Sequence, residues 1–319
     1  MAVNTKVIKR RIKSVSSTKK ITKAMEMVAA AKMRKAVDTA LRTRTYAKLA
    51  WDILVDLAKT PEVKIPLLEV RPVKNVLVIL ITSNRGLCGS FNSNIIKKTS
   101  LQLKNPDNLG VQNIEGKILK TDKVNIDVVG VGKKGAEFAK RNNYNLVASF
   151  TTFSDTPRLS DVLPISQMVI EEYEKKNYDK VVVAYTDFKS AISQTAKLKQ
   201  VLPISVIELE RMMEEIGDEN LQKEKEVLST EEKLDDYLFE PSPQEVLQVI
   251  LPRLVETQLL QATLESSASE HSARMMAMRN ASDAASDMIS ELNLNFNKAR
   301  QAAITQEIAE IAGGAAALE

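Results

Sequence analysis

The sequence has few of the residues from which most reactive sites are built. Among 319 residues it has one cysteine, Cys88, and one histidine, His271. An intramolecular disulfide, a Cys-x-x-Cys motif and a zinc site with four Cys or His ligands are therefore excluded. The longest purely apolar run, residues 76–81, is far too short to span a bilayer. We expect a soluble chain without a bound cofactor or metal, which reaches a membrane only through partners.

Glycine and proline are missing from two long stretches, one near each end of the chain. Residues 3–60 contain neither, and after Pro252 neither occurs until Gly313. Both stretches are rich in residues that favour helix. A helix over 242–312 would be about 100 Å long at 1.5 Å per residue. Such a rod exceeds what a small globular fold needs, so its length points to the function.

Each of these stretches carries an apolar or small-residue stripe at helical spacing. In the C-terminal stretch the stripe follows a heptad pattern, and its members are Leu264, Ala268, His271, Met275, Met278, Ser282, Ala285, Ile289, Leu292, Phe296, Ala299 and Ala303. In the N-terminal stretch the members are Ile8, Ile12, Val15, Thr22, Met25, Ala29 and Ala36. We predict a long antiparallel coiled coil of the two terminal helices. A capping box at Ser242-Pro243-Gln244-Glu245 marks the predicted start of the second helix.

Charge is unevenly distributed along the chain. Residues 1–35 carry eleven Lys or Arg against one acid, whereas residues 208–236 carry twelve acids against four bases. A mitochondrial transit peptide is one interpretation of the basic segment, but the apolar stripe continues past Ala36 without a break. Nucleic-acid binding is another, although no aromatic residue precedes Tyr46 and no recognition motif is present. We favour a basic surface that meets an acidic protein partner.

The middle of the chain alternates between strand and helix patterns. Strands are predicted at 73–81, 124–129 and 180–186, with a further candidate at 191–201, and helices at 92–104, 133–142 and 159–176. Residues 104–123 and 209–235 read as polar excursions. We predict an α/β fold with a Rossmann-like, mostly parallel sheet. The predicted segments are an N-terminal coiled-coil helix (1–60), an α/β domain (73–208), an acidic excursion and linker (209–241), and a C-terminal coiled-coil helix with an apolar tip (242–319).

A glycine motif in the middle segment raises an alternative function. Residues 130–135 match the dinucleotide-binding pattern G-x-G-x-x-G after a predicted strand, and Asp155 lies 20 residues after Gly135. Asp155 falls in a turn, however, so the expected strand–helix–strand context is poor, and the glycines are explained by a tight strand-to-helix connection. A second glycine loop at 83–92 lacks the Lys-Ser/Thr ending of a phosphate loop. A nucleotide- or NAD-binding enzyme with a coiled-coil arm remains the alternative.

Three stretches of the chain resemble the gamma subunit of F-type ATP synthase, the central rotor shaft. They are the basic helix at 8–32, the glycine loop at 83–92, and residues 269–307, which include Ser269-Glu270-His271-Ser272-Ala273-Arg274-Met275 and Asn297-Lys298-Ala299-Arg300-Gln301-Ala302-Ala303-Ile304-Thr305-Gln306-Glu307. The resemblance spans essentially the whole chain, apart from the two excursions. The single cysteine excludes the paired-cysteine redox switch of chloroplast members.

The resemblance implies partners and a set of contact residues. The partners are the alpha and beta subunits, which form the nucleotide-hydrolysing hexamer, the epsilon subunit and the membrane rotor c-ring; no nucleic acid is implied, and the location is the cytoplasmic face of a bacterial inner membrane. By position, Arg300, Gln301 and Thr305 resemble shaft residues that contact a beta-subunit loop. Arg10, Arg11, Lys23, Met25 and Lys32 would face acidic beta-subunit levers, and Tyr237 and Phe239 would contact the ring. The chain itself is then expected to have no catalytic, cofactor or metal residues.

Overall fold

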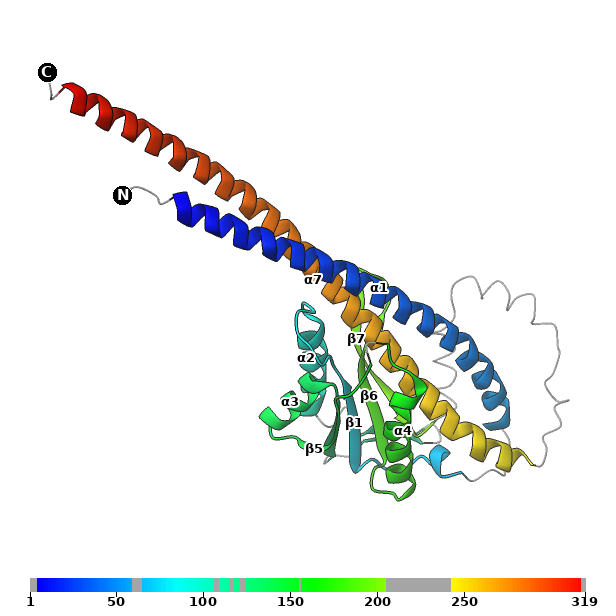
Figure 1. Ribbon diagram of the computed structural model, residues 1–319. Helices are drawn as coiled ribbons and strands as arrows, with labels where there is room; N and C mark the ends of the chain where they lie inside the picture. The colour runs from blue at the N-terminus through cyan, green and yellow to red at the C-terminus, as the bar shows by residue number, and fades with distance from the viewer. Residues whose placement is uncertain are drawn as a thin grey trace. The chain divides into compact units, whose positions relative to one another are not determined.

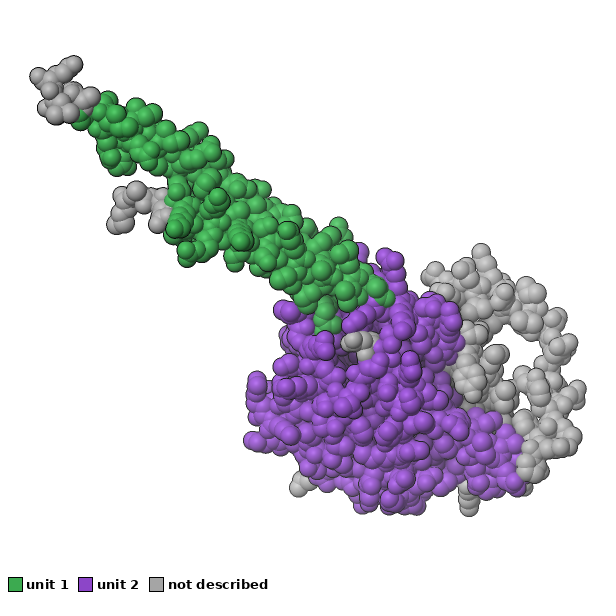
Figure 2. Space-filling model, viewed as in Figure 1, with its two compact units in different colours: residues 1–31, 274–319 green, residues 32–273 purple. Residues whose placement is uncertain are grey.

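The computed structural model describes residues 5–58, 65–105, 109–114, 117–120, 124–154, 156–204 and 242–316. It divides into two compact units, of which the first combines the two ends of the sequence and the second is one continuous stretch (Figure 2). The first unit contains residues 1–31 and 274–319, and the second contains residues 32–273. Two long helices, α1 (Thr5–Ala58) and α7 (Pro243–Ala316), each supply residues to both units.

The first unit is an antiparallel pair formed by the beginning of α1 and the end of α7 (Figure 1). The predicted stripes are the surfaces that pack. In α1, Ile8 and Ala29 are buried, and in α7, Met278, Ser282 and Ala285 are buried. Stripe positions farther along α7 remain half-buried as far as Ala303. The predicted coiled coil is confirmed, and small seam residues allow the two helices to approach closely.

The second unit is built on a five-stranded sheet of order β5-β4-β1-β6-β7. Its strands are β1 (Asn75–Ile81), β4 (Asn125–Val131), β5 (Asn145–Phe150), β6 (Lys180–Phe188) and β7 (Gln194–Leu202). The first four are parallel, and β7 runs antiparallel to β6. The mostly parallel Rossmann-like sheet is therefore confirmed. Its central strands are nearly continuous runs of Val, Ile and Leu because helices cover both faces.

One face of the sheet packs against α2 (Phe91–Lys104) and α3 (Lys133–Arg141), through residues such as Ile95, Leu103 and Ala139. The other face packs against α4 (Leu159–Glu174), the short 3-10 helix η1 (Pro66–Leu68) and the first turns of α7. Leu247 and Leu251 are among the α7 residues in that core. The early part of α7 is thus a layer of the α/β fold, a role that the heptad seam does not reveal.

Two features of the middle segment differ from the prediction. β5 was not predicted, because its exposed and half-buried residues alternate at the edge of the sheet and its apolar signal is short. The excursion at 104–123 contains a small antiparallel hairpin of β2 (Val111–Ile114) and β3 (Lys117–Lys120). The predicted N-cap of α7 is present: the Glu245 backbone N–H donates to Ser242 Oγ at 3.3 Å, Ser242 Oγ lies 3.4 Å from Glu245 Oε1, and the helix begins at Pro243.

Candidate partner-binding surfaces

The basic face of α1 is exposed at most of the predicted contact positions. Arg10, Arg11 and Lys23 are exposed, whereas Met25 is half-buried in the seam. Lys23 Nζ lies 2.9 Å from Glu26 Oε2, the only acid in this part of the helix. Lys32, the first residue of the second unit, is half-buried. The first unit therefore presents closely spaced cationic groups on a rigid helix, as a surface for an acidic partner requires.

The end of α7 presents a second surface. Arg300, Gln301 and Thr305 are exposed, and from Ile304 to residue 314 every residue is exposed. Three of these are large and apolar: Ile304, Ile308 and Ile311 are 48%, 62% and 74% exposed. The spacing of the three isoleucines, four and then three residues, places them on one side of the helix. The packed seam thus ends at Ala303, and an apolar stripe continues with no helix of the described residues against it.

Tyr237 and Phe239, the predicted ring contacts, and the whole acidic excursion at 209–235 lie outside the described residues. So does Asp155, the acid that the dinucleotide interpretation requires. The predicted contact residues that the structure describes thus fall into two groups, one on the basic face of α1 and one at the end of α7.

The two glycine loops lie against each other at the carboxyl ends of β1 and β4. β4, α3 and β5 do form a parallel strand–helix–strand unit, so the poor context predicted for the G-x-G-x-x-G motif was wrong. However, a Cβ on Gly132 would lie 2.1 Å from the Thr82 carbonyl oxygen, and one on Gly135 would lie 3.1 Å from Thr82 Oγ1. These glycines therefore admit the backbone after β1 rather than a ligand.

The first backbone N–H groups of α3 already have partners within the chain. Gly135 N donates to Thr82 Oγ1 at 2.7 Å, Lys133 N to Asn84 Oδ1 at 3.0 Å, and Lys134 N to the Ser83 carbonyl at 3.3 Å. In a dinucleotide site the same groups bind the pyrophosphate. Here the loop after β1 occupies that position, which supports the interpretation of the motif as a tight connection.

The lone cysteine and histidine are both buried. Cys88 is 2% exposed, and its Sγ accepts a hydrogen bond from Asn92 Nδ2 at 3.2 Å. Asn92 Nδ2 also donates to Ser83 Oγ at 2.7 Å, so the loop is closed by its own side chains. His271 is 3% exposed on α7. Among the described residues, no group of three or more His, Cys, Asp or Glu side chains is arranged to hold a metal ion.

An open depression lies at the amino ends of β1 and β4. It is lined by Asn75, Val124, Asn125, Ile126, Asp127, Glu172, Asn177 and Tyr178. Tyr178 Oη donates to Asp127 Oδ2 at 2.8 Å, and Asn177 Nδ2 donates to Glu172 Oε2 at 2.8 Å. Burial, followed by the hydrogen bond to Asp127, raises the pKa of the Tyr178 phenol. The polar groups of the depression thus bond to one another, as in a structural network.

No helix in the described part of the chain is long and apolar enough to cross a membrane. The described surfaces that stand out are the basic face of α1, with Arg10, Arg11 and Lys23 exposed, and the apolar end of α7. Both are suited to protein partners.

Comparison with known proteins places these surfaces in context. A family model described as ATP synthase matches residues 4–318. The ATP synthase gamma chain of Dehalococcoides mccartyi strain CBDB1 is 40% identical over 318 residues, covering 99% of both chains. The ATP synthase gamma chain of Roseiflexus castenholzii is 41% identical over 318 residues, covering 99% of this chain and 98% of the relative.

Solved structures resemble the fold. A chain in the OSCP/F1/c-ring structure of Euglena gracilis mitochondrial ATP synthase, rotational state 3, superposes with a TM-score of 0.60 at 19% identity, covering 98% of this chain and 94% of that one. A chain in the central stalk/c-ring structure of Tetrahymena thermophila mitochondrial ATP synthase gives a TM-score of 0.56 at 24% identity, covering 82% and 99%. At these identities the likeness concerns the fold alone.

Proposed function

The chain belongs to the family of ATP synthase gamma chains, and from this premise we propose how its surfaces serve as the central shaft of the rotary complex. The shaft couples rotation of the c-ring to the conformations of the catalytic sites on the alpha/beta hexamer. An asymmetric shaft touches three otherwise equivalent subunits differently. Turning it therefore changes which conformation each subunit prefers.

The observation that carries this proposal is the end of the packed seam at Ala303. Beyond it, Ile304, Ile308 and Ile311 are exposed on α7. An exposed apolar helix end favours aggregation unless a partner encloses it. We assign this end to an apolar collar of the hexamer, where few directional hydrogen bonds resist turning. Arg300, Gln301 and Thr305 then contact a beta-subunit loop at the edge of the collar.

The basic face of α1 is assigned to the acidic levers of the beta subunits. Arg10, Arg11 and Lys23 are exposed and able to reach a passing carboxylate, with Met25 and Lys32 beside them. Exposed ion pairs each contribute about 0–1 kcal/mol. The interaction is therefore spread over many weak contacts, and no single lysine or arginine is expected to be essential.

The remaining contacts lie toward the membrane. Tyr237 and Phe239 are proposed to contact the c-ring, next to the epsilon subunit. Membrane association is indirect, through the complex, and the proposed location is the cytoplasmic face of a bacterial inner membrane. The bacterial sources of the two relatives support this location.

We further propose that this chain is a non-catalytic subunit without a cofactor, and that nucleotide is bound and hydrolysed by the alpha/beta hexamer. The hydrogen bonding at the N-terminus of α3 supports this view, since its first backbone N–H groups donate to Thr82, Ser83 and Asn84 and are not available to a phosphate. The alternative, a nucleotide- or NAD-binding enzyme, predicts saturable binding by the isolated chain. Titration with NAD and with ATP is expected to show none.

The test is assembly and cross-linking with alpha and beta subunits. A cysteine at Thr305, used with a short bifunctional reagent, is expected to attach to a beta subunit and stop ATP hydrolysis. Asp283→Cys is the matched control, because it is exposed on the same helix about 33 Å away along the axis at 1.5 Å per residue. The unmodified chain controls for Cys88, which is buried. Failure to form a complex whose ATPase activity depends on this chain would overturn the proposal.

A further inference from the structure

The segment that leads into β1 is attached to the sheet by a buried arginine. Ile65 and Leu67 of this segment are in the core, and the Ile204 backbone N–H donates to the Leu67 carbonyl at 3.1 Å. The segment then passes Arg71, whose side chain is only 11% exposed. In the sequence it follows α1 and leads directly into β1.

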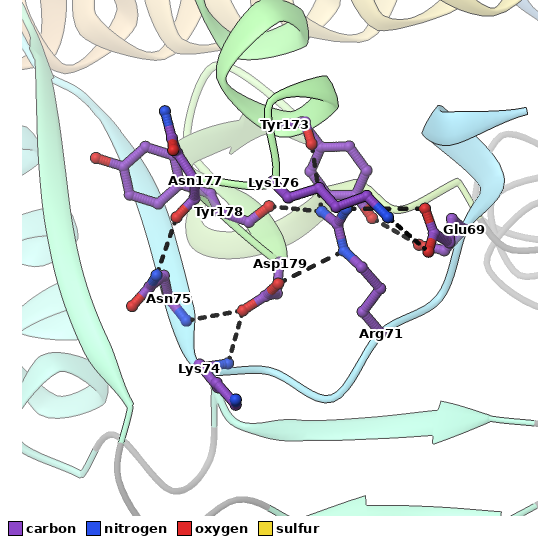
Figure 3. Close-up of polar contacts among 9 residues, drawn as sticks. All are labelled: Glu69, Arg71, Lys74, Asn75, Tyr173, Lys176, Asn177, Tyr178 and Asp179. Atoms are coloured by element: carbon purple, nitrogen blue, oxygen red, sulfur yellow. Dashed lines mark hydrogen bonds and ion pairs between the residues drawn. The ribbon is translucent and has the colours of Figure 1, made fainter.

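The Arg71 guanidinium lies among groups from two other elements (Figure 3). Its Nη2 donates to the Tyr178 carbonyl at 2.8 Å and to the Tyr173 carbonyl at 3.3 Å. Its Nε lies 3.5 Å from Asp179 Oδ1, and its Cζ lies 4.5 Å from the centre of the Tyr173 ring. The side chain therefore joins the segment before β1 to the end of α4 and to the turn before β6.

The neighbours of Arg71 make further bonds between the same three segments, which are the segment before β1, the end of α4 and the turn before β6. Tyr173 Oη donates to the Glu69 carbonyl at 2.9 Å. Asp179 Oδ2 accepts from the backbone N–H groups of Lys74 and Asn75, at 2.9 and 3.1 Å. Lys176 Nζ lies 3.3 Å from Glu69 Oε1 (Figure 3). Burial raises the pKa of the Tyr173 phenol above its ordinary value.

A largely buried cluster of charged and polar side chains contributes little net stability to a fold. Burying a guanidinium and a carboxylate costs desolvation energy that their attraction only partly offsets, and apolar residues of similar size often serve stability as well. What the guanidinium adds is direction at one nitrogen, because Nη2 donates to two backbone carbonyls, those of Tyr178 and Tyr173, in one geometry. The early turns of α7, in contrast, pack on the sheet through apolar residues such as Leu247 and Leu254.

We propose that Arg71 is a positioning residue for coupled rotation: with Asp179 and Tyr173 it fixes the chain between α1 and β1 on the sheet, so that load on the coiled coil is passed to the α/β unit. The inference rests on the shaft function proposed above. Directional bonds oppose sliding of the segment past the amino ends of β1 and β6, which apolar contacts do much less. Loss of the guanidinium leaves the shaft able to turn without load, but under load less of the force on the coiled coil is passed to the α/β unit.

The test compares unloaded with loaded work in the whole complex. ATP hydrolysis is measured in detergent without a proton gradient, and ATP-driven proton pumping is measured in vesicles. Arg71→Leu is expected to keep most of the unloaded hydrolysis, whereas the ratio of pumping to hydrolysis falls about two- to tenfold. Arg71→Lys, which keeps the charge but lacks the planar guanidinium, is expected to fall in between. Lys175→Ala is the matched control, since it breaks only an exposed pair with Glu171 and should leave the ratio unchanged.

The outcomes separate this inference from the shaft proposal. A wild-type chain that supports neither assembly nor pumping overturns the shaft function itself. A working wild type, with Arg71→Leu complexes that assemble and keep the wild-type ratio, overturns only the role of Arg71 and leaves it as a stabilising contact. Should Arg71→Leu fail to assemble, Arg71→Lys and Asp179→Asn decide by the same ratio. An unchanged ratio in both again overturns the role.

Discussion

Replacing Gly132 by alanine tests whether the glycine motif is a packing device. The residue has φ of +92°, and a Cβ there would lie 2.1 Å from the Thr82 carbonyl oxygen and 2.8 Å from the Thr82 carbonyl carbon. The strand end cannot easily withdraw, because Thr82 N donates to the Val131 carbonyl at 2.8 Å and Gly135 N holds Thr82 Oγ1. The substitution must therefore strain the backbone or separate the ends of β1 and β4.

Both terms of the cost can be approximated. A side chain in a backbone region reserved for glycine costs about 1–3 kcal/mol, and overpacking a tight site costs about 1–3 kcal/mol. We expect Gly132→Ala to lower the free energy of unfolding of the α/β unit by about 2–6 kcal/mol, a large part of the stability of a typical domain. Gly86→Ala is the control, because a Cβ at Gly86 meets nothing within 4 Å. It should change stability by about 0.5 kcal/mol or less.

The assay is urea unfolding of the isolated chain followed by circular dichroism, with hydrogen exchange of β1 and β4 as a local readout. The expected result is a lower midpoint and faster exchange in these strands for Gly132→Ala alone. If Gly132→Ala and Gly86→Ala unfold together with the wild type, the loop has room that the structure does not show. The packing explanation would then fail, and binding of a nucleotide at this loop would have to be measured again.

Two further predictions concern the second unit. Burial raises the pKa values of Tyr173 and Tyr178. Above the ordinary tyrosine pKa of about 10 the unfolded chain therefore releases these protons first, and the free energy of unfolding falls with rising pH. The melting temperature should decline less steeply with pH in Tyr178→Phe than in the wild type, and equal slopes would contradict a raised pKa of Tyr178 in the folded chain. Leu254→Ala should lower the free energy of unfolding by about 2–5 kcal/mol, because Leu254 of α7 is 2% exposed and packs in the core beside the sheet. The control Val249→Ala, at a site of the same helix that is 67% exposed, should change the free energy of unfolding by about 0.5 kcal/mol or less. Similar losses for the two variants would show that α7 does not pack as described.

The long helices and the central strands were predictable because their signals are repeated many times. An apolar or small residue recurs every three or four positions from Leu264 to Ala303, and each recurrence adds support for a helix with one packed face. The strands β1 and β6 contain the unbroken apolar runs 76–81 and 181–185, which are typical of a sheet covered on both faces. The exposed end of α7 was also predictable, since apolar residues continue beyond the last basic residue, Arg300.

What could not be predicted depends on residues that are distant in sequence or on weak local patterns. The Arg71 cluster joins residues about a hundred positions apart, and none of its members belongs to a motif. β5 is a short edge strand whose register is set by pairing with β4. The role of the early turns of α7 was hidden as well, because Leu247, Leu251 and Leu254 would suit a coiled coil and a sheet-covering helix equally. Only the tertiary contacts decide between them.

The participation of α7 in the sheet's core has a consequence for how the protein is made. The last strand of the sheet ends at Leu202, yet the apolar face that includes Leu77, Ile79 and Val183 also packs against residues up to Ala262. About sixty residues must still be synthesised, which takes about 3–12 s at 5–20 residues per second. During that interval a nascent chain lacks the α7 residues that cover this face of the sheet. The core of the α/β unit therefore cannot be completed before Ala262 has been synthesised.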